Sequence, residues 1–139
     1  MRIAAVMIIV LAVVVGVVPQ FTDCQSHGRS IELPGGRSLP MKCHWTALAE
    51  IALAVPLLLC GVSLLVSRRK ESWRQQAVLT TVLGLSVVLL PTVLIGVCAR
   101  PDMVCCALMK PTLTLAGILV AALGALCFLL AGRQKEGAE

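Results

Sequence analysis

The chain has 139 residues, of which 58% are hydrophobic and 14% charged, with a formal net charge of +5 at pH 7. A composition this apolar does not suit a small water-soluble domain, because such a domain has a large surface that must face water. Aromatic residues make up only 3%, and the basic residues flank apolar runs instead of forming a stripe, which excludes a nucleic-acid-binding protein. The surroundings of most of the chain are therefore predicted to be the lipid bilayer.

The first apolar run, residues 3–19, follows a single charge at Arg2. It resembles the hydrophobic region of a secretory signal and is slightly short for a span, which favours removal. No small-x-small cleavage site follows it, however, and residues 20–23 lack the small side chains of a lipoprotein cleavage site before Cys24. We therefore expect this run to be retained as a membrane helix.

Three further runs are long enough to cross the hydrocarbon core, at residues 45–66, 77–98 and 107–130. The predicted fold is an all-α membrane protein, a four-transmembrane-helix bundle that forms one domain. The spans are joined by a first outer loop at 20–44, a basic loop at 67–76 and a short polar turn, and a tail follows at 131–139. The first outer loop is polar and contains turn-forming residues at 34–36.

Lysine and arginine near the helix ends predict the orientation, because positive side chains resist translocation. The densest group is Arg68, Arg69, Lys70 and Arg74 in the 67–76 loop. Placing this loop in the cytoplasm puts both termini there too (N-in/C-in) and puts the cysteine-rich loops outside. The expected location is the cytoplasmic (inner) membrane of a prokaryote.

Small residues are expected where the helices meet, since lipid gives apolar helices no hydrophobic reason to associate. Gly117, Ala121 and Ala125 form a flat seam on the fourth span, and Gly84 and Gly96 offer close approach on the third. The same seam is a candidate surface for a membrane protein partner or for a homo-oligomer.

Five of the seven cysteines fall at or beyond the outer surface, while Cys60 and Cys127 lie within spans. An outer compartment permits disulfides, so one interpretation is two structural bridges. In this interpretation the first bridge lies within the first outer loop and the second within the other outer loop; the candidates are Cys24 with Cys43, and Cys98 with Cys105 or Cys106.

A second interpretation is a soft-metal site, because thiolates, thioethers and imidazole suit monovalent copper. Two groups of such side chains begin the second and fourth spans: Met41, Cys43 and His44, and Met103, Cys105, Cys106 and Met109. Neither group has the ligand spacing of a zinc ribbon. A thiol-disulfide relay is a third interpretation, against which stands the absence of a Cys-x-x-Cys pattern.

Glu50 is the one acidic residue inside a predicted span. A carboxyl group at this depth has to face protein or water, which marks it as a candidate functional residue. We expect it either to pair with Lys110 or, when protonated, to donate a hydrogen bond to a carbonyl. A small transporter that uses Glu50 is one functional alternative.

The start of the second span reads Met41-Lys42-Cys43-His44-Trp45-Thr46-Ala47 and continues to Ala49-Glu50. With the cysteines of the second outer loop, this segment resembles a family of small prokaryotic four-span membrane proteins catalogued as domain of unknown function 4418. The resemblance covers most of the chain and implies the four-span topology. It also favours an accessory subunit of a larger membrane assembly such as an exporter.

Catalytic motifs are missing: the sequence has no phosphate-binding glycine loop, no nucleophile elbow and no paired carboxylates. We therefore expect a non-enzymatic accessory or partner-binding protein with no cofactor. The alternatives are an outer-face thiol redox or copper-binding protein and the transporter.

Overall fold

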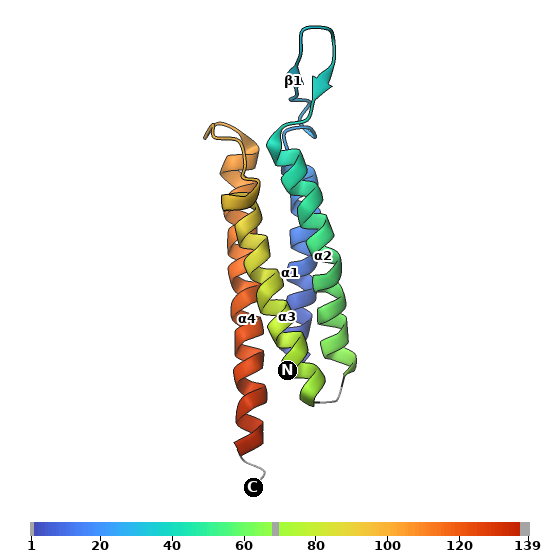
Figure 1. Cartoon of the computed structure of the whole chain (residues 1–139), viewed down its shortest axis with the longest axis vertical. Coiled ribbons are helices and arrows are strands. Elements are labelled where there is room, and N and C mark those ends of the chain that lie inside the picture. The colour runs from blue at the N-terminus through green and yellow to red at the C-terminus, as the bar shows by residue number, and fades with distance from the viewer. Residues whose placement is uncertain (1, 68–69, 137–139) are drawn as a thin grey trace.

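The computed structural model describes residues 2–67 and 70–136, which form a bundle of four long helices (Figure 1). All four helices are long and apolar enough to cross a membrane. The predicted four-helix membrane fold is thus confirmed. In chain order the four α-helices are α1 (Arg2–Thr22), α2 (Lys42–Val66), α3 (Lys70–Leu89) and α4 (Lys110–Glu136). Helix α3 continues into a π-helix, η1 (Leu90–Leu94), and a second π-helix, η2 (Cys105–Met109), precedes α4.

Two helix ends differ from the predicted spans in a way that bears on function. Helix α2 begins at Lys42 instead of residue 45, so Cys43 and His44 lie on its first turn. The third span ends at Leu94 instead of residue 98, which leaves Cys98 in an irregular segment. Helix α3 begins at Lys70, and the predicted cytoplasmic residues Arg68 and Arg69 lie outside the described residues.

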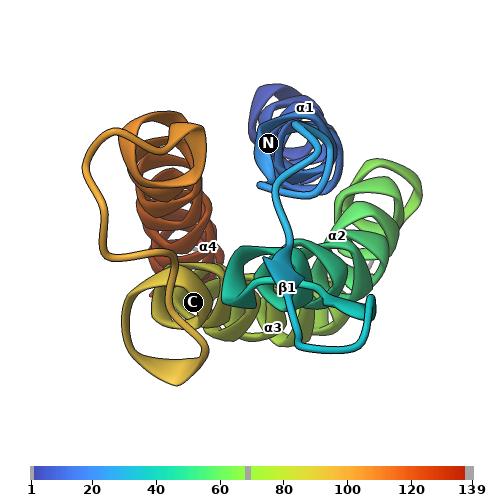
Figure 2. The ribbon, with the colours of Figure 1, turned by 90° about the horizontal axis from the view of Figure 1, so that it is seen from above.

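The helices are arranged as two hairpins, with α1 along α2 and α3 along α4 (Figures 1 and 2). Both ends of the chain lie at one end of the bundle, and the connections 23–41 and 95–104 lie at the other (Figure 1). Which end faces the cytoplasm stays a prediction.

Each helix buries one stripe of side chains and leaves the rest of its apolar surface exposed. The buried side chains form two apolar clusters. The cluster nearer the termini contains Ile8, Leu57 and Val120, and the cluster nearer the connections contains Val15 and Leu113. Large apolar residues point outward along every helix, and in water this surface would be unfavourable. In a bilayer the lipid chains cover it, so packing between helices rests on close fit.

Helices α3 and α4 approach closely at Gly84. A Cβ atom on Gly84 would lie 2.6 Å from the Ala121 nitrogen and 2.9 Å from the Gly117 oxygen. Most of the predicted seam therefore packs against α3 of the same chain, because Gly117 and Ala121 face that helix. Of its three residues, only Ala125 is exposed. Gly96 does not pack between helices as expected: it lies past η1 with a φ of 77°.

The first connection contains a structure that the sequence analysis did not predict. A two-stranded antiparallel hairpin, β1 (Ile31–Glu32) and β2 (Ser38–Leu39), stands beyond the end of the bundle (Figure 1). Its turn contains Gly35 and Gly36, both with positive φ, which only glycine adopts readily. The hairpin is exposed along its whole length.

Replacing Gly84 with alanine tests the close approach of α3 and α4. The added methyl group would press on the backbone of α4, and we expect a loss of stability on the order of 1–3 kcal/mol, seen as a lower melting temperature in detergent. Gly132→Ala is the control, since no described atom lies within 4 Å of a Cβ atom there. Equal melting temperatures for the two variants would contradict this packing.

Candidate metal centre

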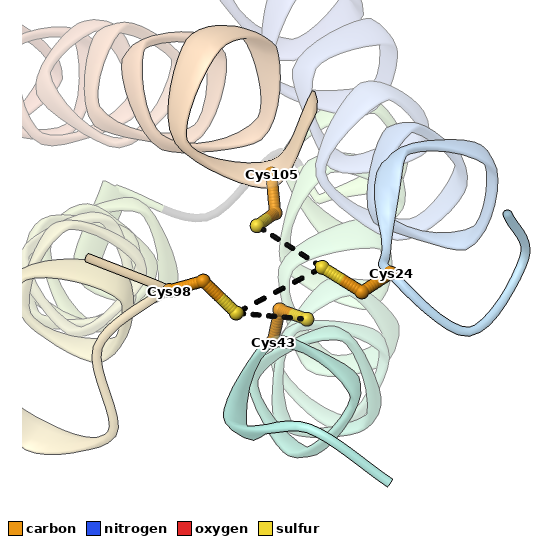
Figure 3. A group of neighbouring side chains, drawn as sticks. All are labelled: Cys24, Cys43, Cys98 and Cys105. Atoms are coloured by element: carbon orange, nitrogen blue, oxygen red, sulfur yellow. Dashed lines mark hydrogen bonds between the residues drawn. The ribbon is translucent and has the colours of Figure 1, made fainter. Parts of the chain in front are cut away.

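Four cysteines converge at the end of the bundle that carries the connections. The sulfur atoms of Cys24, Cys43, Cys98 and Cys105 all lie within 4.8 Å of one another. Figure 3 shows the four side chains pointing toward a common centre from separate segments. We call this group the four-cysteine centre.

Each cysteine is contributed by a different part of the chain. Cys24 follows the end of α1, Cys43 lies on the first turn of α2, Cys98 follows η1, and Cys105 is the first residue of η2. The centre therefore depends on all four helices being in place.

Hydrogen bonds of Asp23, the residue after α1, hold the first two cysteines. An oxygen of Asp23 accepts a bond from the Ser26 backbone N–H at 2.8 Å, and its other oxygen lies 3.1 Å from Nδ1 of His44. Burial by itself raises the pKa of Asp23, but the bonds with Ser26 and His44 outweigh it, and the pKa lies below its ordinary value. Because Asp23 precedes Cys24 and His44 follows Cys43, this contact fixes both thiols.

Cys98 is positioned through a contact between α2 and the segment after η1. The Thr46 hydroxyl donates a hydrogen bond to the Gly96 carbonyl at 2.8 Å, and the Gly96 N–H donates to the Leu90 carbonyl at 3.0 Å. Pro91 has no backbone N–H, so the α-helical ladder cannot continue unchanged there. The wider π turn and the left-handed Gly96 then redirect the chain toward α2.

Cys105 is positioned by the second π-helix. Its carbonyl accepts the N–H of Lys110, five residues later, which is the bond of a π turn. Pro111 follows directly. As Pro91 does in η1, it places a residue without a backbone donor where α and π geometry meet. The result is a fully buried Cys105 at the head of α4.

The sulfur atoms lie close together but are not bonded. Cys24 is 3.3 Å from Cys105 and 3.8 Å from Cys98, and Cys43 is 3.8 Å from Cys98. All seven cysteines of the chain lie in the described ranges and are free thiols. Burial raises the pKa of the Cys24 thiol above its ordinary value, and the neighbouring thiols raise it further.

Two methionines extend this group of sulfur ligands. The Met41 sulfur lies 3.9 Å from that of Cys98, and the Met103 sulfur lies 3.9 Å from that of Cys24. Each thioether thus lies beside a different thiol of the centre.

The centre brings together only part of the predicted metal set. Cys43 and Cys105 are in it, Met41 and Met103 border it, and Met109 is buried in the adjoining core. His44 is engaged with Asp23, and the half-buried Cys106 is not among the four.

Cys24 and Cys98 were predicted only as disulfide partners, and they complete the centre. Disulfide formation stays a prediction, although the shortest sulfur distance joins Cys24 to Cys105, a pair from different connections that we did not predict. The role of Asp23 was missed. Its position beside Cys24, matching that of His44 beside Cys43, is the signal that pointed to it.

Glu50 has neither of its expected partners. Its side chain is fully buried on α2, and among the described residues neither carboxyl oxygen has a hydrogen-bond partner. The expected ion pair with Lys110 is absent, because the Lys110 side chain is exposed at the start of α4. Glu50 lies seven residues beyond Cys43 on the same buried face, about 10 Å further along the helix axis.

The geometry of the four-cysteine centre suits one metal ion. A tetrahedron of sulfur atoms with metal–sulfur bonds of about 2.3 Å has edges of about 3.8 Å. Of the six sulfur distances, two match this edge, one is shorter at 3.3 Å, and the other three are at most 4.8 Å, so small shifts would complete the tetrahedron. A bound cation would also favour the thiolate form that burial disfavours.

The chain belongs to the family described as Domain of unknown function (DUF4418), which matches residues 3–130. Neither a curated protein nor a solved structure matches it. It is an integral membrane protein of a family whose name assigns no activity, so a function has to be argued from the site.

Replacing Thr46 with valine tests how Cys98 is held. Valine keeps the shape but removes the bond to Gly96, and we expect a loss of about 1 kcal/mol in stability together with faster maleimide labelling of Cys98, measured by mass spectrometry. Thr92→Val is the matched control, because Thr92 bonds only to carbonyls of its own helix and is exposed. Equal Cys98 labelling in both variants would argue against the Thr46 contact.

Replacing Glu50 with glutamine tests whether this residue has a structural partner. Because no partner is lost and a buried carboxyl group is removed, we expect the melting temperature in detergent to stay equal or to rise. Glu71→Gln, at an exposed position on the first turn of α3, is the control and should change nothing. A clear fall for Glu50→Gln alone would mean that the carboxyl group is bound in the folded protein.

Proposed function

We propose that this membrane protein binds one monovalent copper ion at the four-cysteine centre. The observation that carries the proposal is the convergence of four sulfur atoms, from four segments, within 4.8 Å of one another. This corresponds to the soft-metal interpretation of the sequence, with a ligand set that includes Cys24 and Cys98.

The compactness of the centre favours a single ion. In an iron–sulfur cluster several metal ions and bridging sulfides separate the cysteine ligands, so their sulfur atoms lie further apart than in a mononuclear site. Sulfur distances of 3.3 to at most 4.8 Å leave room for one ion only.

The surroundings favour monovalent copper over zinc. Thioethers are soft ligands that suit Cu(I), and Met41 and Met103 each lie 3.9 Å from a thiol of the centre. Zinc bound by four thiolates would leave two negative charges in a site where Cys43 and Cys105 are fully buried. Cu(I) can be held by fewer thiolates with neutral thioethers in support, which leaves less uncompensated charge.

Structural disulfides explain less of the arrangement. Two bridges would join the cysteines pair by pair, and neither pair would need to meet the other. The four thiols instead share one centre, bordered by two methionines whose sulfur atoms a disulfide does not need. A thiol-disulfide relay likewise gives the thioethers no role.

The wider role of the protein remains a set of predictions. An accessory subunit of an exporter is compatible with a copper-binding centre at the predicted outer face, since such a subunit would hold or pass the ion. A transporter that uses Glu50 is the other prediction, and it needs a route for its substrate beside a residue that is now fully buried.

Adjacent cysteines provide a matched test of copper binding. We expect the anaerobically purified protein to bind one Cu(I) per chain in competition with a chromogenic chelator. Cys105→Ser should weaken binding by more than about 100-fold, the upper range for residues that only support a ligand. Cys106→Ser, one residue along and outside the centre, should bind as the wild type does.

Three results would overturn the proposal. The first is no Cu(I) binding by a protein that retains all its thiols, and the second is equal weakening by the two serine variants. The third is stoichiometric Zn²⁺ binding that Cu(I) does not displace. Thiol counting before each titration excludes loss of binding through oxidation.

A further inference from the structure

We infer that a soft monovalent cation reaches the four-cysteine centre through one cavity, and that Met103 transfers it from that cavity to Cys24. This inference rests on the proposed copper binding and adds to it an access route and a transfer residue.

Three of the four thiols of the centre are closed to solvent. Cys43 and Cys105 are fully buried and Cys24 is 4% exposed, whereas Cys98 is half-buried. An ion from the aqueous phase therefore enters either beside Cys98 or through an opening that reaches one of the buried thiols.

Such an opening lies beside Cys24. A cavity of about 230 Å³ is formed between the turn that follows α1 and the segment that precedes η2. Its lining residues are Cys24, His27, Arg29, Asp102, Met103 and Val104. It thus connects exposed residues with one thiol of the centre.

The side chains of this cavity become softer and more buried toward the centre. His27 is exposed and offers an imidazole, Met103 is half-buried and offers a thioether, and Cys24 is buried and offers a thiol. All three are ligand types that Cu(I) accepts, whereas harder cations have little affinity for a thioether. The cavity also carries one positive and one negative charge, Arg29 and Asp102, so it does not repel a monovalent cation as a whole.

Met103 suits a transfer step because of its chemistry and its position. A thioether has no proton to release and binds Cu(I) without adding charge, so it can receive the ion and give it up. Its sulfur is already 3.9 Å from that of Cys24, close enough for a small shift to let both bind one ion.

Met41 supplies the internal comparison. Its sulfur also lies 3.9 Å from a thiol of the centre, that of Cys98, but Met41 does not line the cavity. If the methionines serve only as weak ligands, the two should behave alike. If Met103 transfers the ion, they should differ in the rate of loading.

The test measures loading of the full-length protein in detergent with Cu(I) supplied as its bathocuproine disulfonate complex, followed anaerobically by stopped-flow absorbance. We expect Met103→Leu to load about tenfold more slowly than the wild type, while its equilibrium affinity changes no more than that of Met41→Leu. Met41→Leu should load at the wild-type rate. Leucine is close to methionine in volume, so both variants should fold.

His27→Ala gives a second measurement at an exposed position where folding is not at risk. It should also slow loading without changing the final occupancy. A wild-type loading rate for Met103→Leu would overturn the inference. So would equal slowing by Met103→Leu and Met41→Leu, which would make both methionines ordinary supporting ligands. Failure of the wild type to bind Cu(I) at all would instead overturn the proposed function.

Discussion

The hydrocarbon interior of a membrane accepts a polypeptide only when every backbone N–H and C=O is bonded within the protein. This constraint commits most of the chain to four uninterrupted helices and leaves irregular backbone only where the helices end. The irregular elements lie toward the end of the bundle that carries the connections 23–41 and 95–104 (Figure 1). They are the β-hairpin, both π-helices and the left-handed Gly96. The four cysteines lie there too, so the candidate site belongs to the part of the chain where irregular backbone is tolerated.

Each of the two π-helices positions one cysteine of the centre. Pro91 lies within η1, and Cys98 follows that helix. Cys105 is the first residue of η2, and Pro111 lies two residues after its end. A π turn contains an extra residue compared with an α turn, so it rotates the side chains beyond it relative to the regular helix. Pro91 thereby affects where Cys98 can point.

The fold was predictable because its signal is local: four apolar runs of sufficient length identify the spans, and the structure confirms them. The helix ends were less predictable, since polar residues such as Lys42 continue a helix beyond the hydrocarbon. The site was predictable only in part. Spacing along the chain relates Cys24 to Cys43 and Cys98 to Cys105, but contacts between these pairs depend on the depth and rotation of all four helices. For the same reason the sequence could not show that Asp23 meets His44, or that Glu50 and Lys110 stay apart.

Because its four cysteines come from four segments of the chain, the centre also imposes an order on assembly. Cys24 and Cys43 are synthesised before Cys98 and Cys105, so a chain with only its first hairpin inserted has two of the four thiols. During that interval the two early thiols can combine only with each other or with an outside reagent. Under the proposed copper binding, the complete site for the ion exists only after the second hairpin has been made.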